Sequence, residues 1–218
     1  MNATPKFPKM YRWALLATGF CVLVVVLGAF TRLVDAGLGC PDWPGCYGHL
    51  TWPQSEAAVE RAEATFPEFP VEHDKTWPEM VHRYAAGLLG LLILGLTIAT
   101  WRQAGRDADN HYPRKHTLGL LILVVVQALF GMWTVTLKLW PQVVMAHLLG
   151  GFATLSLLWL LSQRYAGRSW RMPSNSVRRL RGTASLIWLV LVLVIVQIAL
   201  GGWVSANYAA LAWTDFPL

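Results

Sequence analysis

Five long apolar runs are the feature that most limits what this 218-residue chain can fold into. Each run is close to the roughly 20 residues that a helix needs to cross the hydrocarbon core of a bilayer. The runs are 13–30, 80–101, 117–137, 143–161 and 184–203. Because lipid offers the backbone no hydrogen-bond partners, each run is expected to form a spanning helix. The predicted fold class is therefore an all-α integral membrane protein.

Composition and charge support this class. Hydrophobic residues make up 55% of the chain and charged residues only 14%, which is too few charges for an ordinary soluble domain. Of the 18 basic residues, 13 precede the first run or lie in the connections 102–115 and 164–181, all on one side. Ten of the 12 acidic residues lie on the opposite side, mostly between 31 and 79. The positive-inside rule then predicts a cytoplasmic N-terminus and an external loop 31–79, and the basic residues need no nucleic acid to explain them.

The segment 31–48 contains four glycines and two prolines, which exclude a regular helix or a central strand. It is expected to be a specifically turned loop. Cys40 and Cys46 lie in it, and a disulfide that staples the loop is the favoured reading in an oxidising compartment. Two alternatives stay open. A zinc site would need more ligands than the adjacent His49 provides, and both cysteines could be free thiols.

A polar cluster occupies the outer end of the second apolar run. Glu79, His82 and Arg83 have the spacing that places them on one face of a helix, which is expected to begin after Pro78. The fourth run presents His147 at a similar depth, and both runs head inward from the external side. Charged and imidazole groups inside a membrane are costly, so their presence indicates a functional site.

Two imidazoles at matched depth on parallel helices predict one metal centre. Small neighbours would leave room for a flat macrocycle; they are Gly87, Gly150 and Gly151. Axial ligation by two histidines makes that macrocycle a haem, and Arg83 could pair with a haem propionate. The alternative is that the histidines only form hydrogen bonds between helices. Gln127 is expected to make such an interhelical hydrogen bond, and the other histidines are expected in loops, outside the ligand set: His49, His73, His111 and His116.

Two further features concern the chain outside the runs. Residues 55–69 have a helical period with one apolar face, which predicts a short helix on the outer membrane surface or a solvated connector. Residues 27–30 (LGAF) and 200–203 (LGGW) correspond at an offset of 173, and Asp42 and Pro44 match Asp215 and Pro217 at the same offset. The predicted domains are thus a four-helix haem-binding unit, 1–165, and the start of a second, truncated four-helix repeat, 184–218.

Together these motifs resemble the N-terminal half, plus the fifth helix, of the haem A synthase (COX15/CtaA) family. The resemblance rests on Thr31-Arg32-Leu33, on Gly37-Leu38, on Cys40-Pro41-Asp42-Trp43-Pro44 with Cys46, on Glu79-x-x-His82-Arg83 and on His147. It covers nearly the whole chain. Family members have eight helices in two similar halves, and each half contributes a histidine pair. The resemblance implies that three helices with the second pair are missing here, so the chain alone should be inactive.

The resemblance also implies an activity: oxidation of a methyl group of haem O to the formyl group of haem A, for terminal oxidases. His82 and His147 would hold the substrate haem iron, and haem b would occupy the missing half. Glu79 matches the catalytically important acid of the family, and Cys40 and Cys46 match its loop disulfide. The implied location is the bacterial plasma (inner) membrane. Implied partners are membrane lipid, haem O synthase and terminal oxidase assembly factors, with no nucleic acid.

Two other functions compete with this one. A membrane cytochrome b that only carries electrons would use the same histidine pair. A scaffold subunit without haem would use the histidines only for hydrogen bonds between helices.

Overall fold

A computed structural model describes residues 5–107, 109–167 and 174–209, and side chains are described outside 174–181. The described residues form six helices: α1 (Pro8–Leu33), α2 (Glu56–Thr65), α3 (His73–Arg106), α4 (Arg114–Thr136), α5 (Pro141–Ala166) and α6 (Ser174–Ala206). Five of them are long and apolar enough to cross a membrane. The predicted all-α membrane fold is confirmed.

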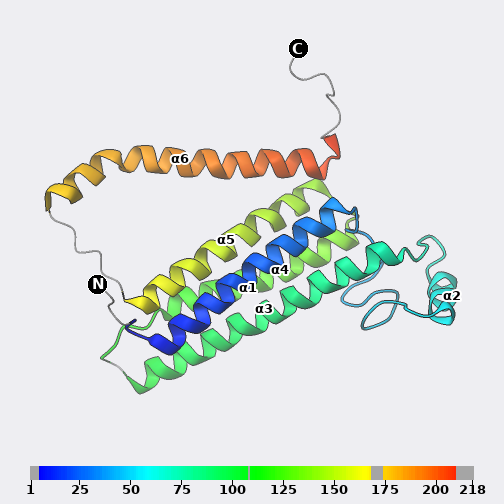
Figure 1. Cartoon of the computed structure of the whole chain (residues 1–218), viewed down its shortest axis with the longest axis horizontal. Coiled ribbons are helices and arrows are strands. Elements are labelled where there is room, and N and C mark those ends of the chain that lie inside the picture. Colours follow the sequence, from blue (N-terminus) through cyan, green and yellow to red (C-terminus); the bar gives the residue numbers. More distant parts are fainter. Residues whose placement is uncertain (1–4, 108, 168–173, 210–218) are drawn as a thin grey trace, which may run out of the picture.

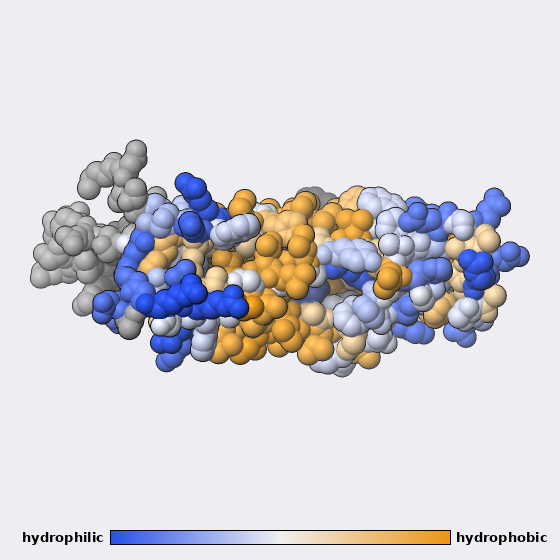
Figure 2. All heavy atoms as spheres, turned by 90° about the horizontal axis from the view of Figure 1, so that it is seen from below, coloured by the Kyte–Doolittle hydropathy of each residue, from blue (hydrophilic) through white to orange (hydrophobic). Residues whose placement is uncertain are grey.

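Four of the helices form a closed ring. α1 packs against α3 and α5, and α4 packs against the same two helices, so α3 and α5 lie diagonally opposite each other. Figure 1 shows this bundle with α6 along one side, where α6 contacts α5. We call the end of the bundle that carries residues 34–72 the loop end, and the opposite end the basic end. Figure 2 shows a hydrophobic band between these two hydrophilic ends.

The helices extend past the predicted apolar runs, because backbone hydrogen bonding continues into the polar flanks. α6 begins at Ser174, ten residues before its predicted run, and α3 begins at His73 rather than after Pro78. Pro78 is the sixth residue of α3, and because it has no N–H the helix lacks one backbone hydrogen bond, to the carbonyl of Asp74. Glu79, His82 and Arg83 therefore lie on established helix rather than at its first residues.

The short helix predicted within 55–69 is present as α2 and ends at Thr65. The side chain of Ser55 caps it by accepting a hydrogen bond from the N–H of Ala58. Ala62 of α2 is buried in a cluster with Cys40, Cys46, Tyr47 and Met80. The apolar face of α2 thus covers the cysteine loop.

The bundle core is apolar and fills the basic end. Its buried side chains come from all four helices of the ring: Met10, Ala14, Ala17, Cys21 and Val24 of α1, Leu89, Ile93 and Leu96 of α3, Leu120 of α4, and Leu158, Leu161 and Tyr165 of α5. Cys21 is a buried free cysteine. Two interhelical contacts lie at this end: Thr100 Oγ1 with the hydroxyl of Tyr165, and Thr97 Oγ1 with the carbonyl of Thr117 at 3.2 Å.

The ends of α1 and α6 meet at the loop end. Arg32 Nε donates to Ser205 Oγ at 3.3 Å, and the Tyr208 hydroxyl donates to Asp35 at 2.8 Å. Both pairs are 173 residues apart, which is the offset of the predicted repeat. The division into two units stays a prediction, and the residues expected to continue the second repeat, 210–218, lie outside the described part of the chain.

Candidate haem site

A rigid loop closes the loop end of the bundle. The sulfur atoms of Cys40 and Cys46 lie 2.05 Å apart, and both residues are fully buried. Asp42 organises the turn between them, because its carboxylate accepts hydrogen bonds from the N–H groups of Tyr47 at 2.6 Å and Gly48 at 2.9 Å. Gly39 lies against the backbone of Lys75 in α3, where a Cβ atom would collide with the Lys75 carbonyl.

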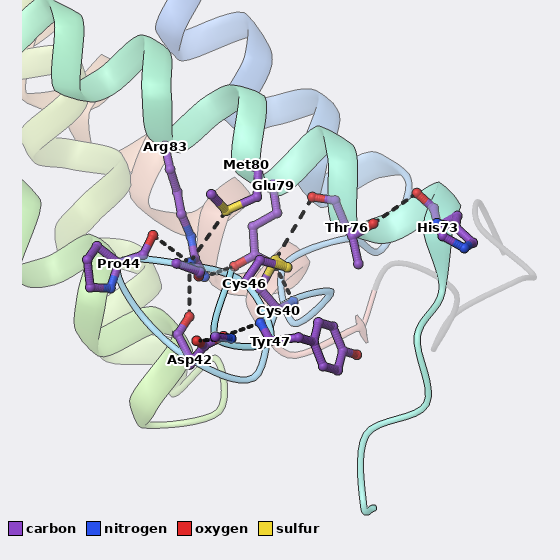
Figure 3. Close-up of a disulfide and its surroundings, with 12 residues drawn as sticks. Cys40, Asp42, Pro44, Cys46, Tyr47, His73, Thr76, Glu79, Met80 and Arg83 are labelled. Carbon is purple, nitrogen blue, oxygen red and sulfur yellow. Dashed lines mark hydrogen bonds and ion pairs between the residues drawn. A yellow bond between two sulfur atoms is a disulfide. The ribbon is translucent and has the colours of Figure 1, made fainter. Parts of the chain in front are cut away.

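Glu79 and Arg83 attach this loop to α3 (Figure 3). The two side chains form an ion pair, and only 7% of the Glu79 side chain and 12% of the Arg83 side chain are exposed. The other carboxylate oxygen of Glu79 accepts a hydrogen bond from the N–H of Cys40 at 3.0 Å. Arg83 Nη1 donates to the carbonyls of Asp42, at 2.9 Å, and Gly45. The polar cluster of the sequence is therefore the anchor of the cysteine loop.

Tyr47 completes the cover over this anchor. Its ring packs edge-on against Phe66, and its hydroxyl donates to the carbonyl of Pro70 at 3.0 Å. Burial, with nearby acidic groups such as Glu72, raises the pKa of Tyr47 to about 12. The side chain therefore remains a neutral phenol that can donate this hydrogen bond at physiological pH.

His82 of α3 faces a glycine of the neighbouring helix. A Cβ atom at Gly28 of α1 would lie only 2.9 Å from Cε1 of the His82 ring, so no larger residue fits there without a shift of the imidazole. The backbone of Val24, one turn along α1, also lies against the ring. Nδ1 of His82 is buried and has no hydrogen-bond partner among the residues that the structure describes.

His147 of α5 has the same kind of environment. Gly131 of α4 lies against its ring, and a Cβ atom there would be 3.6 Å from Cε1. The backbone of Gln127, one turn along α4, lies against this ring as well. Nδ1 of His147 is also buried and, in the described part of the chain, has no partner. Each histidine thus packs on a glycine of an adjacent helix and keeps one unsatisfied ring nitrogen.

The two histidines lie between the two buried clusters. On α3, Met80 belongs to the cluster at the loop end and Leu89 belongs to the bundle core. His82 lies between these two residues along the helix and belongs to neither cluster. His82 and His147 come from the diagonal helices α3 and α5 and are close enough for their charges to interact. A buried nitrogen without a partner is costly, so these two atoms fit a ligand that needs nitrogen donors.

A haem iron fits this donor set. Among the described residues, no three His, Cys, Asp or Glu side chains come together to hold a bare metal ion. Two imidazoles alone suit an iron that brings four nitrogen ligands of its own, as a porphyrin does. The glycines that face the rings are the small residues that a flat macrocycle would need beside its axial ligands.

The structure changes several sequence-based predictions about this site. The glycines against the imidazoles are Gly28 and Gly131, whereas a Cβ atom at Gly87 or Gly151 would meet no other described part of the chain within 4 Å. Sequence reasoning missed these glycines because helix neighbours are not visible in a single sequence. The Nη atoms of Arg83 are occupied by Glu79 and the cysteine loop.

Not every remaining polar residue lies where it was expected. The prediction that the remaining histidines lie in loops was wrong for two of them, because His73 begins α3 and His116 lies in the first turn of α4. The ring of His116 is bonded to the carbonyl of Leu157 at 3.0 Å, and the backbone of His49 pairs with Cys46. The interhelical hydrogen bond predicted for Gln127 is absent among the described residues, since no hydrogen bond of its side chain is found there.

Comparison with known proteins assigns the chain to a family. A model of the cytochrome oxidase assembly protein (COX15-CtaA) family matches residues 11–218. The chain belongs to this family. It is 48% identical over 199 residues to a haem A synthase of Shewanella oneidensis, covering 91% of this chain and 58% of that protein. No solved structure was found to match.

Two more distant relatives carry the same name. A haem A synthase of Bacillus cereus is 28% identical, with 96% of this chain and 62% of that protein covered. One of Chelativorans is also 28% identical, with 91% and 59% covered. The chain therefore spans about three fifths of the length of these relatives.

Proposed function

We propose that the protein containing these residues is a haem A synthase, which oxidises a methyl group of haem O to a formyl group and so makes haem A for terminal oxidases. One observation carries the proposal: His82 and His147, from diagonal helices, each hold a buried and unpartnered ring nitrogen at the loop end. The similarity to haem A synthases over nine tenths of the chain supports it.

In this proposal His82 and His147 hold the iron of the substrate haem. The bound haem would supply the methyl group that is oxidised, which lies on its rim, and the two imidazoles would fix the position of that rim in the site. Gly28 and Gly131 keep the faces of the two imidazoles free of side chains. The bundle core at the basic end and the anchored loop with α2 exclude water from the two ends of the site. Water exclusion strengthens electrostatic interactions in the site and suppresses side reactions.

Glu79 is proposed as the acid that the reaction requires. It lies one turn from His82 on α3, so the two side chains share a helix face. Its contacts with Arg83 and the N–H of Cys40 hold the carboxylate in a fixed position. The contacts of the two Nη atoms of Arg83 support a role for this residue in holding the loop. Its Nε makes no hydrogen bond within the described residues and therefore remains available to a propionate.

The setting of the site is also part of the proposal. We infer a bacterial plasma membrane location with the loop end outside, where the Cys40–Cys46 disulfide would persist. We infer a second four-helix unit that follows this one and holds haem b. The contacts of Arg32 with Ser205 and of Asp35 with Tyr208 support it, since they join positions that the repeat makes equivalent. Haem O synthase and terminal oxidase assembly factors are the proposed partners.

The activity is tested by expressing the complete gene that encodes these residues together with a haem O synthase. Chromatography of extracted haems should show haem A, and His82→Ala or His147→Ala should leave haem O alone. Accumulation of haem O alone with the unaltered protein would contradict the proposal.

The histidine pair equally suits a membrane cytochrome b that only transfers electrons. Glu79→Gln separates the two functions. In a haem A synthase this variant should retain its haem and lose haem A formation. If the unaltered protein binds haem and forms no haem A, the electron carrier is favoured.

A further inference from the structure

We propose that the side-chain amide of Gln127 recognises an oxygen atom on the rim of the bound haem, and that Gln127 is a specificity-determining residue of this site. The inference rests on the proposed function, because it takes the occupant of the site to be a haem. Gln127 lies on α4, and no side chain of this helix was part of the haem site predicted from the sequence.

The first observation is the state of the Gln127 side chain. Only 9% of Gln127 is exposed, yet its amide makes no hydrogen bond among the described residues. A glutamine amide carries two donor hydrogens and one acceptor oxygen. Its amide atoms are not among the fully enclosed side-chain atoms that lack a partner in the described part of the chain, so they keep some accessible surface. A polar group in so restricted a position needs a hydrogen-bonding partner, and a ligand that enters the site can supply it.

The second observation is where the amide lies. Gly131 and Gln127 are one turn apart on α4, and Gly131 lies against the ring of His147. On α5, Gly150 lies one turn beyond His147 on the same face. A Cβ atom at Gly150 would collide with the Nε2 and Cδ atoms of Gln127. The amide therefore lies across Gly150, directly on the basic-end side of the His147 ring.

The third observation is an asymmetry between the two imidazoles. His82 meets Gly28 and the backbone of Val24, and His147 meets Gly131 and the backbone of Gln127. In each pair the glycine follows the second residue by four positions. The surroundings of the two histidines are alike, except that Val24 has an isopropyl side chain where Gln127 has an amide. A symmetric axial ligand set needs no such difference, whereas discrimination between rim substituents does.

The chemistry of the haem rim supplies the partner. A porphyrin rim is mostly apolar apart from its propionates. Haem O adds a hydroxyl group on its alkyl tail, and haem A has in addition a formyl oxygen in place of one methyl group. The amide N–H of Gln127 can donate to either oxygen. Buried polar groups that lose a hydrogen-bonding partner discriminate strongly against the ligand that lacks it.

The test is a titration of the purified chain with haem b, haem O and haem A, which differ in their rim oxygens. Gln127→Met keeps the side-chain length and removes the hydrogen bond. We expect it to weaken binding of an oxygen-bearing haem by about tenfold, the scale of one buried hydrogen bond, and to leave haem b affinity unchanged. Loss confined to haem A would identify the formyl oxygen, and equal loss for haem A and haem O would identify the tail hydroxyl.

A second variant moves the amide without removing it. Gly150→Ala should reproduce the effect of Gln127→Met, because its Cβ displaces the amide. Gly151→Ala is the matched control, since a Cβ at Gly151 meets nothing within 4 Å. Where the formyl oxygen is the partner, resonance Raman spectra of bound haem A should show the formyl stretch at higher wavenumber in Gln127→Met than in the unaltered chain.

Unchanged haem preference in Gln127→Met, or equal weakening of all three haems, would overturn this inference. Lower thermal stability of the haem-free protein with unchanged preference would make Gln127 a packing residue. If the unaltered chain bound none of the three haems, the proposed function itself would fail.

Discussion

The two ends of the same four-helix ring are built in opposite ways. At the basic end, apolar side chains from all four helices interlock. At the loop end, glycines face imidazoles, and a separate cluster closes the bundle around the cysteine loop. Close packing at one end fixes the positions of the helices. That fixed arrangement allows the other end to keep two buried nitrogen atoms without partners.

The largest effect is expected from the histidines. His82→Ala should abolish stable haem binding by the chain, because an axial ligand is lost. His116→Ala is the matched control at the basic end, where the imidazole is already bonded to the Leu157 carbonyl. Absorption spectra after haem reconstitution should show a Soret band for the control and none, or a strongly shifted one, for His82→Ala. Equal spectra for both variants would show that His82 is no more important for haem binding than His116, and would contradict the difference between the two ends.

Breaking the anchor of the cysteine loop should have the next largest effect. Glu79→Gln leaves the buried Arg83 charge unpaired, and we expect a loss of roughly 3 kcal/mol in the free energy of unfolding. The Cys40–Cys46 disulfide should then be reduced faster by an added thiol, as followed by mass spectrometry of alkylated peptides.

Glu72→Gln provides the control for this anchor. Its ion pair with Lys75, at 2.9 Å, lies on the same helix end, but the Glu72 side chain is 51% exposed. Such an exposed pair contributes at most about 1 kcal/mol. A similar reduction rate in both variants would show that Glu79 does not hold the loop.

Filling the space beside an imidazole should have an intermediate effect. Gly28→Ala places a Cβ atom 2.9 Å from the His82 ring, so the ring must move, and we expect haem affinity to fall about tenfold. Gly131→Ala, with its 3.6 Å contact, should have less effect, and Gly19→Ala, with nothing within 4 Å, should have none. A haem titration that fails to rank the variants in this order would contradict the geometry of the site.

The smallest effect is expected at the basic end. Tyr165→Phe removes the hydroxyl that contacts Thr100 and should cost about 1 kcal/mol in the free energy of unfolding. Haem affinity should not change. Thermal unfolding and a haem titration of the same sample measure both quantities, and a loss of haem affinity would show that the ends are coupled.

The sequence was sufficient for the membrane helices, and it singled out the polar residues of the candidate site. Apolar runs of spanning length have few structural alternatives in lipid, and Glu79, His82 and His147 stand out in them because polar groups there are costly. The helix ends were less accurate. Hydropathy marks the hydrocarbon boundary, whereas α3 continues five residues beyond Pro78 toward its N-terminus.

Contacts between helices could not be predicted from one sequence. Which glycine faces an imidazole depends on the ring order of the helices and on their rotation, so Gly28 and Gly131 carried no signal of their own. The sequence suggested a propionate as the partner of Arg83. The contacts of Arg83 with the carbonyls of Asp42 and Gly45 could not be predicted, because they depend on the fold of the cysteine loop. Gln127 stood out as a polar residue at mid-helix, but its lack of a partner is visible only in the structure.

The central claim is that His82 and His147 bind one haem iron between them. Electron paramagnetic resonance of the ferric, haem-loaded chain tests it most directly. The expected result is one haem per chain with a low-spin signal of two axial imidazoles, which is lost in both His82→Ala and His147→Ala. A high-spin signal in the unaltered chain, or a low-spin signal that survives either substitution, would contradict the claim.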